Sequence, residues 1–171
     1  MPVAAMAYLP FPTAAADALV GSDMRPTPPT RAGQVDRVVV KKAERRLYLM
    51  RGSEPIRTYE IALGFQPIGH KARQGDGKTP EGRYRLDWRN DRSQFYKALH
   101  ISYPNAQDRH RAHGQGQDPG GLILIHGQGR TSRPTGEQGR DWTHGCIAVS
   151  NQDIDEIWSL TMDGLPIDIL P

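Results

Sequence analysis

Apolar residues occur in this chain in short runs, and glycine, proline or polar residues separate the runs from one another. The 171 residues include 18 glycines and 14 prolines. No stretch approaches the roughly 18 consecutive apolar residues that a membrane-spanning helix requires. This pattern favours many short strands joined by turns over a bundle of long helices.

Eight segments are predicted to be strands from their apolar content, their alternation or the turn residues beside them. These segments are 35–41, 47–50, 56–63, 83–88, 98–103, 122–125, 147–149 and 165–170. The run 122–125 is continuously apolar, as expected for a strand buried on both faces. The polar segments between strands are predicted to be loops, and the one at 105–121 is long enough to cover a cleft as a lid.

One helix is predicted near the C-terminal end of the chain. Ser150 or Asn151 can accept hydrogen bonds from the free N–H groups of its first turn. Ile154, Ile157 and Trp158 recur at helical spacing and form one apolar stripe. The predicted fold class is therefore mostly β, a sandwich or barrel-like sheet with one helix after the single cysteine.

Length and composition indicate one folded domain at residues 35–171. Residues 1–34 carry six of the 14 prolines, and we expect a disordered leader or the remnant of an export segment there. No lysine or arginine precedes Arg25, so a signal peptide with a basic start is not evident. The net charge of +3 is spread along the chain and does not suggest nucleic acid as a partner.

The single cysteine, Cys146, lies where a glycine-containing loop enters a short apolar segment. A thiol attacks a substrate only as thiolate, so it needs an imidazole or a positive field nearby. His144 is two residues away, and N–H groups around Gly145 could face a developing oxyanion. His126 ends an apolar run beside Gly127 and is well placed to face a cleft.

Simpler interpretations compete with this one. A lone cysteine is more often a small buried hydrophobic residue than a nucleophile. One cysteine also excludes an internal disulfide and a cysteine-based zinc cluster. We interpret the remaining histidines as surface or hydrogen-bonded core residues: His70, His100, His110 and His113. No metal site is predicted, because His110 and His113 lie in a polar segment without the glutamate of a zinc-binding helix.

The segments 125–127 (Ile-His-Gly) and 143–147 (Thr-His-Gly-Cys-Ile) together resemble the signature of YkuD-type L,D-transpeptidase catalytic domains. Residues 79–82 (Thr-Pro-Glu-Gly) are similar to the Thr-Pro-x-Gly segment of that family. Asn151 and Asp153 match the Asn-x-Asp that opens the helix after the cysteine. The resemblance covers the whole predicted domain.

Within the family, the Gly-Cys-Ile-Ala form of the cysteine motif looks like the YafK branch. Many members carry an arginine two residues after the cysteine, where this chain has Ala148. The resemblance therefore leaves open how a substrate carboxylate is held. Arg133 and Arg140, in the loop before the cysteine motif, are the candidates for that contact.

The resemblance implies an enzyme that acts on a peptidoglycan stem peptide. Cys146 would attack the carbonyl that joins an L-centre, typically of diaminopimelate, to D-Ala, and D-Ala would leave as a thioester forms. His126 would be the base, oriented by the Gly127 carbonyl. His144 would line the acyl pocket and is the second candidate base. The backbone N–H groups of His144, Gly145 and Cys146 would hold the oxyanion.

An amine acceptor would then resolve the thioester and build a crosslink. The resemblance also implies that Gly127 and Thr143 lie beside the substrate, that no metal or organic cofactor is needed, and that the protein works in the periplasm or cell envelope. Two alternatives remain open at this stage. The same cysteine and histidines could hydrolyse a wall peptide bond, or the chain could be a wall-binding module without catalysis, although binding alone needs no thiol.

Overall fold

The structure is a computed structural model that describes residues 34–129 and 141–171. Nearly all of the predicted leader therefore lies outside the described residues. Arg133 and Arg140 also lie outside them, so their predicted contact with a carboxylate stays a prediction.

Eight strands form one mixed sheet within the described residues. In chain order they are β1 (Arg37–Lys41), β2 (Arg46–Arg51), β3 (Glu54–Glu60), β4 (Gly82–Ser93), β5 (Tyr96–Ile101), β6 (Leu124–His126), β7 (Ile147–Ala148) and β8 (Pro166–Leu170). Their order across the sheet is β3-β2-β1-β8-β4-β5-β6-β7. The pairs β1–β8 and β6–β7 are parallel, and the other neighbours are antiparallel.

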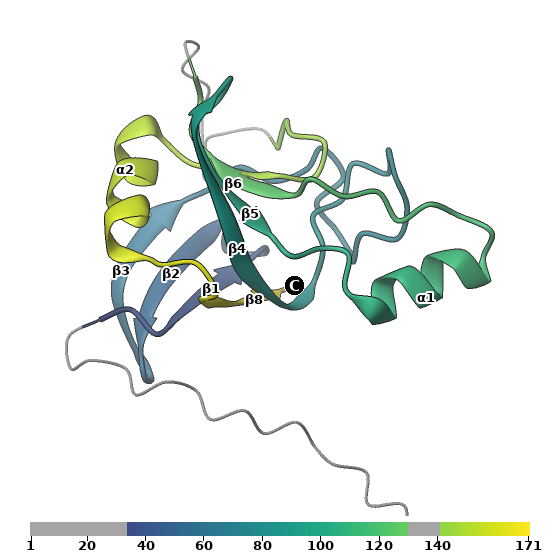
Figure 1. Cartoon of the computed structure of the whole chain (residues 1–171), viewed down its shortest axis with the longest axis horizontal. Helices are drawn as coiled ribbons and strands as arrows, with labels where there is room; N and C mark the ends of the chain where they lie inside the picture. The colour runs from purple at the N-terminus through teal and green to yellow at the C-terminus, as the bar shows by residue number, and fades with distance from the viewer. Residues whose placement is uncertain (1–33, 130–140) are drawn as a thin grey trace, which may run out of the picture.

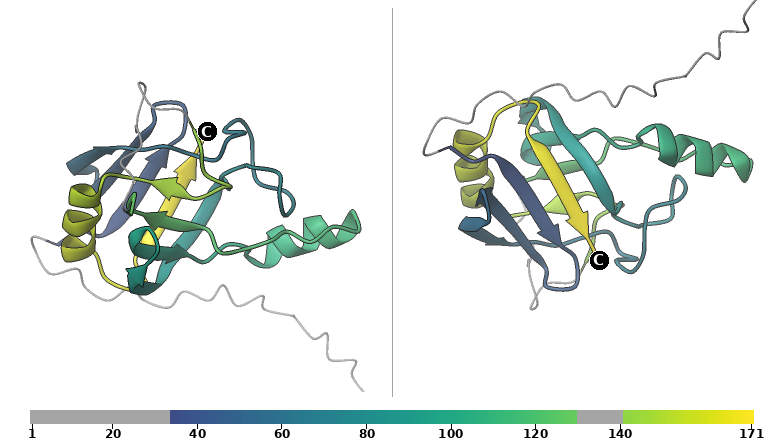
Figure 2. Two further views of the ribbon diagram at one scale, coloured as in Figure 1. Left: turned by 90° about the horizontal axis from the view of Figure 1, so that it is seen from above. Right: turned by 90° about the horizontal axis from the view of Figure 1, so that it is seen from below.

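The sheet curls back on itself (Figures 1 and 2). Strand β4 pairs with β8 along its first part and with β5 along the rest, so it belongs to both halves of the curl. Ala62, just after β3, exchanges two backbone hydrogen bonds of 2.9 Å with Ala148 in β7. Because β3 and β7 are the two ends of the sheet order, this bridge brings the ends together. The predicted fold class, a β-rich sandwich or barrel-like domain, is confirmed.

The core lies inside this curl. Alternate residues of β1 and β2 face it with no exposed surface: Val38, Val40, Leu47 and Leu49. The predicted helix is present as α2 (Asn151–Leu160), and Ser150 caps it by accepting the Asp153 N–H at 3.0 Å. Ile154 and Ile157 of α2 are fully buried, which is the stripe that the spacing predicts.

The prediction of a loop over 105–121 was wrong for its first half. Helix α1 (Ala106–Gly114) occupies it and begins with a capping box, in which Asn105 and Asp108 bond each other's backbone N–H groups. The helix is polar on most of its surface, so it lacks the apolar stripe that marks a helix in sequence. It extends from the sheet on the side away from α2 (Figures 1 and 2).

The predicted strand 122–125 is displaced toward the C-terminus. Strand β6 is Leu124–His126, so His126 is its last residue. Leu122 is 70% exposed and has φ +53°, in the left-handed region that residues with a Cβ rarely adopt. Its side chain therefore points to solvent instead of entering the core.

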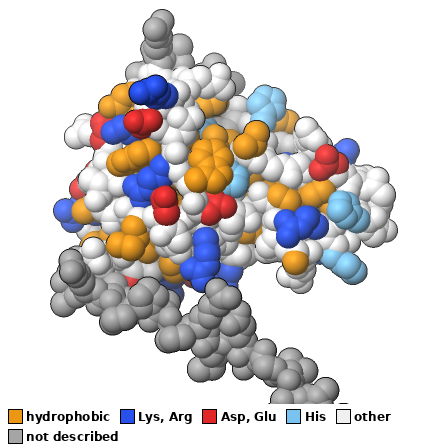
Figure 3. Space-filling model, in the orientation of Figure 1, with side chains coloured by type: hydrophobic (Ala, Val, Ile, Leu, Met, Phe, Trp, Pro, Cys, Tyr) orange, Lys and Arg blue, Asp and Glu red, His pale blue; other side chains and the backbone are white. Residues whose placement is uncertain are grey.

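In residues 34–129 and 141–171, neither helix has the length and apolar character needed to cross a membrane. Basic and acidic side chains are interspersed on the face seen in Figure 3.

Candidate active site

Cys146 lies directly before β7, and His126 ends the neighbouring strand β6. The parallel register pairs His126 with Ala148. Cys146 precedes the first residue of β7, so it lies two residues before the partner of His126 in the neighbouring strand. The fold thus brings the segments that carry the thiol and this imidazole together at one edge of the sheet.

The ring of His126 is held by three neighbours. Phe95 stacks on it at a centroid distance of 4.4 Å, and Trp142 meets it edge-on at 5.9 Å. Its Nδ1 bonds the Gly127 carbonyl oxygen at 2.6 Å, which confirms the predicted contact. Because that oxygen can only accept, Nδ1 carries the proton and Nε2 keeps a free lone pair. His126 is 1% exposed, and this burial lowers its pKa below the ordinary 6.5 despite the opposing effect of the Gly127 carbonyl.

The Cys146 side chain is half-buried, and its Sγ–H donates to the Leu122 carbonyl oxygen at 3.5 Å. Burial raises the pKa of this thiol above the ordinary 9.0. The backbone N–H of Leu124 and the charge of Lys71 oppose the rise. Burial thus favours the neutral form of both the thiol and the imidazole, so a base must remove the thiol proton during attack.

Thr143 and Gly145 shape the turn that presents Cys146. The Thr143 hydroxyl accepts the Gly145 N–H at 3.1 Å and donates to the Cys146 carbonyl oxygen at 2.7 Å. Gly145 has φ +129°, and a Cβ there would lie 2.7 Å from the Lys78 carbonyl oxygen, so the position requires glycine. Because its N–H is already bonded, Gly145 contributes a conformation rather than a free donor, contrary to its predicted part in the oxyanion site.

Asn151, the first residue of α2, fixes the chain after His126. Its Oδ1 accepts the Gln128 N–H at 2.7 Å, and its Nδ2 donates to the Gly129 carbonyl oxygen at 3.0 Å. A Cβ on Gly127 would lie 2.5 Å from the same Oδ1. Sequence reasoning connected Asn151 only with the start of a helix; its match to the Asn-x-Asp segment was the signal for a second role.

An open groove of about 560 Å³ has Leu122, the hydrogen-bond partner of the Cys146 thiol, in its wall. His144 also lines this groove. Lys71, Gln74 and Asp118 line the part farther along. A groove that combines charged, amide and apolar groups suits a peptide segment carrying charges of its own.

His144 is exposed in this groove and does not share the burial of His126. Its ring stands edge-on against Phe65, with 5.5 Å between the ring centroids. Phe65 is itself 44% exposed. His144 thus has the position of a pocket-lining side chain, whereas His126 has the fixed orientation that a base requires.

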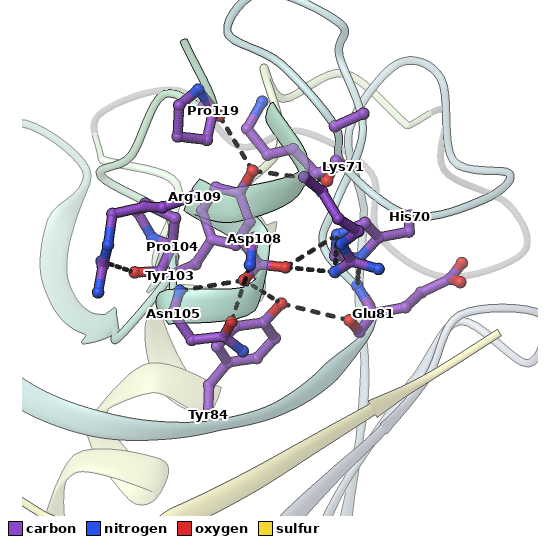
Figure 4. A network of polar contacts seen from close by, with 12 residues as sticks. His70, Lys71, Glu81, Tyr84, Tyr103, Pro104, Asn105, Asp108, Arg109 and Pro119 are labelled. Carbon is purple, nitrogen blue, oxygen red and sulfur yellow. Dashed lines mark hydrogen bonds and ion pairs between the residues drawn. The ribbon is translucent and has the colours of Figure 1, made fainter. Parts of the chain in front are cut away.

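The walls of the groove are two loops that polar contacts hold together. Gln74 in one loop donates its N–H to the Asp118 carbonyl oxygen in the other at 2.8 Å. The Tyr103 hydroxyl lies between the Pro119 carbonyl oxygen, at 3.0 Å, and that of Lys71, at 3.5 Å (Figure 4). The groove is therefore built into the fold.

Asp108 of α1 is the centre of this network (Figure 4). Its buried carboxylate accepts from the Tyr84 hydroxyl at 2.9 Å and from Arg111 at 2.6 Å, and it lies 3.1 Å from Nε2 of His70. The Nδ1 of His70 accepts the Glu81 N–H at 3.0 Å, so Nε2 carries its proton. His70 is thus a hydrogen-bonded structural histidine, as expected, and α1 anchors the loop that begins the groove.

The other histidines lie in surroundings unlike that of His126. His100 stacks on Trp88 at 4.5 Å and bonds Asp87, while His110 and His113 are exposed on α1. Within residues 34–129 and 141–171, no group of three or more His, Cys, Asp or Glu side chains is arranged to hold a metal ion.

The chain matches the model of the YkuD family, the L,D-transpeptidase catalytic domain, over residues 35–169. It is 33% identical over 173 residues to YafK of Escherichia coli strain K12, a protein named as a member of the L,D-transpeptidases. That match covers 94% of this chain and 63% of YafK, so the chain spans less than two thirds of this relative.

Solved structures with the same fold include Pgp2 of Campylobacter jejuni, described as a helical cell shape determining protein. It shares 27% identity at a TM-score of 0.60, over 78% of this chain and 46% of that one. An L,D-transpeptidase from Mycobacterium smegmatis superposes with a TM-score of 0.54 at 13% identity, over 79% of this chain and 58% of that one.

Proposed function

Because the chain belongs to the YkuD family of L,D-transpeptidase catalytic domains, we propose that it is a cysteine-dependent L,D-transpeptidase that acts on peptidoglycan stem peptides. One observation carries the assignment of roles. The buried His126 donates its Nδ1 proton to the Gly127 carbonyl oxygen and keeps its Nε2 lone pair, in the strand that pairs with the segment directly after Cys146. A lone cysteine that served only for packing would not need an oriented imidazole on the neighbouring strand.

In the acylation step, Nε2 of His126 takes the thiol proton while Sγ of Cys146 attacks the carbonyl carbon between the L-centre of diaminopimelate and D-Ala. The carbonyl oxygen becomes an oxyanion. We assign its stabilisation to the backbone N–H groups of His144 and Cys146, since the Gly145 N–H is bonded to Thr143. The His126 imidazolium then protonates the leaving nitrogen, the C–N bond breaks, and D-Ala departs from a thioester.

In the second step, an amine acceptor attacks the thioester carbon. His126 removes a proton from the attacking nitrogen and returns it to the sulfur as the C–S bond breaks. Water in place of the amine would give hydrolysis by the same groups. Since stem peptides are found in the cell wall, this function assigns the protein to the periplasm or cell envelope.

Product analysis on purified muropeptides tests the proposal. The protein is incubated with a disaccharide tetrapeptide donor and an excess of an amine acceptor, and products are identified by mass spectrometry. We expect release of D-Ala together with the crosslinked product, and neither with Cys146→Ala.

Three other outcomes would replace the proposal. Water-derived product alone would make the protein a wall peptidase. Binding without turnover would make it a wall-binding module. D-Ala release by Cys146→Ala would remove the cysteine as nucleophile.

A further inference from the structure

Lys71 is a buried cation at the groove. Its side chain is 3% exposed, which is unusual for a lysine and occurs when the charge has fixed partners. Its ammonium donates to Oδ1 of Asp76 at 2.9 Å and to the Arg73 carbonyl oxygen at 3.0 Å. A lysine ammonium has three N–H donors, and the third finds no acceptor among the residues that the structure describes.

The groove is where that third donor can be used. Lys71 lines it together with His144 and with Leu122, whose carbonyl oxygen accepts the Cys146 Sγ–H. The charge of Lys71 also acts on Cys146, whose pKa it lowers against the effect of burial. The groove thus connects the Lys71 side chain with Leu122, whose carbonyl oxygen accepts the hydrogen bond of the thiol.

The chain lacks the cation that many family members carry two residues after the cysteine. Ala148 occupies that position with no exposed surface and is bonded to Ala62 on one side and paired with His126 on the other. A substrate carboxylate cannot be held from there. The other charged residue that lines the groove, Asp118, is negative and cannot hold it either.

We propose that Lys71 holds a carboxylate of the stem peptide in the groove beside Cys146. This inference rests on the proposed function for the identity of the ligand. Two carboxylates of the donor are candidates, that of the leaving D-Ala and that of the diaminopimelate side chain. In both cases the ammonium donates one charge-assisted hydrogen bond to a carboxylate oxygen, while Asp76 and Arg73 keep the ammonium in place.

The surrounding contacts explain how this lysine stays available. Asp76 accepts the backbone N–H groups of Ala72, Arg73 and Lys78 as well as the Lys71 ammonium. These bonds fix the loop even before a substrate arrives. The lysine therefore meets its ligand with little loss of side-chain entropy, which is the advantage of a preorganised site.

Binding to the Cys146→Ala protein tests the inference independently of turnover. Calorimetry is done with three synthetic stem tetrapeptides: one unmodified, one amidated at the D-Ala carboxylate, and one amidated at the diaminopimelate side chain. We expect one of the amides to bind roughly tenfold to a hundredfold more weakly than the acid, because a hydrogen bond to a charged group is lost. The amide that binds more weakly identifies the carboxylate.

When Lys71→Gln is added to the Cys146→Ala protein, we expect equal affinity for the unmodified and the amidated peptides. Lys42→Gln is the matched control and should keep the tighter binding of the unmodified peptide. Lys42 is as buried as Lys71 and is paired with Glu81 at 2.7 Å, but it lines a different hollow.

If the protein with Lys71→Gln still binds the unmodified peptide more tightly than the amidated ones, the inference is wrong. It is also wrong if the Cys146→Ala protein binds all three peptides equally. Failure of the proposed function would look different. In that case the peptides bind with a preference that depends on Lys71, but the protein with Cys146 intact gives no D-Ala release. If no stem peptide binds, both proposals fall.

Discussion

At the residue scale, the surroundings of two side chains decide how the site works. Burial lowers the pKa of His126 and raises that of Cys146, so each environment favours the neutral form. The contact between His126 and Gly127 could be predicted from the sequence because it joins adjacent residues. The role of Lys71 could not, since a lysine in a glycine-rich loop looks like an ordinary solvated charge until the fold buries it.

The pH dependence of turnover follows from these two shifts. Attack needs a neutral His126, so kcat/KM should fall with decreasing pH through a value below 6.5. The reaction also needs the thiol proton, because His126 later delivers it to the leaving nitrogen. We therefore expect kcat/KM to decrease as the pH rises above 9.0 as well. The measurement is kcat/KM for D-Ala release across the pH range.

His144→Gln separates the two candidate bases in the same experiment. If His126 is the base, the decrease of kcat/KM at low pH should occur at the same pH in this variant as in the parent. A change in the absolute rate does not affect this expectation. If the decrease of kcat/KM at low pH disappears in His144→Gln, the role of base passes to His144.

At the element scale, the short segments around the site differ in how far the sequence predicts them. The spacing of Ile154 and Ile157 is sufficient to identify α2. Helix α1 has no such stripe, and its capping box of Asn105 and Asp108 was the one readable signal. Strand β6 is displaced because Leu122 takes a left-handed conformation, which hydrophobicity alone does not reveal.

Helix α1 is expected to stabilise the groove through its buried carboxylate. Asp108→Ala removes the acceptor of Tyr84 and Arg111, and we expect a loss of about 3–5 kcal/mol in the free energy of unfolding, as for other broken buried pairs. Asp163→Ala is the control, because the Asp163 side chain is 55% exposed and its partner Arg89 keeps bonds to Trp158 and Thr161; this loss should cost about 0–1 kcal/mol.

Urea unfolding at equilibrium measures both variants. Equal free energies of unfolding for Asp108→Ala and Asp163→Ala would show that the network in Figure 4 does not anchor α1. Selective loss of stability in Asp108→Ala, with weaker stem-peptide binding, would support the helix as the anchor of the groove.

At the scale of the whole molecule, the closure of the curled sheet brings the site together. Ala62 bonds Ala148 in both directions, and Leu63 and Phe65 continue the contact by bonding the backbone of Thr143. These partners are far apart in sequence, and neither Ala62 nor Ala148 has a side chain that marks the pairing. The sequence therefore predicts the β-rich class and the order of the elements, but not the bridge that joins the ends of the sheet.

Interrupting the closure should affect stability and activity together. Ala62→Pro removes the N–H that bonds the Ala148 carbonyl oxygen, and an unpaired buried acceptor costs about 1–3 kcal/mol. Ala43→Pro is the matched control at the second position of an exposed turn closed by Lys42 and Arg45, where proline is favoured. It should stay within about 0.5 kcal/mol of the parent.

Both proline variants are compared by urea unfolding and by D-Ala release. An Ala62→Pro protein that is as stable and as active as Ala43→Pro would mean that the bridge to β7 does not position Cys146.

The pairing of His126 with Cys146 is tested most directly by intact-protein mass spectrometry of the enzyme quenched in acid during turnover of a stem tetrapeptide. We predict that the protein gains the mass of the donor without D-Ala, that peptide mapping places this mass on Cys146, and that His126→Gln accumulates it roughly 10²–10⁴-fold more slowly. Product formation with the acyl group on another residue, or acylation that proceeds at the parent rate without His126, would contradict this pairing.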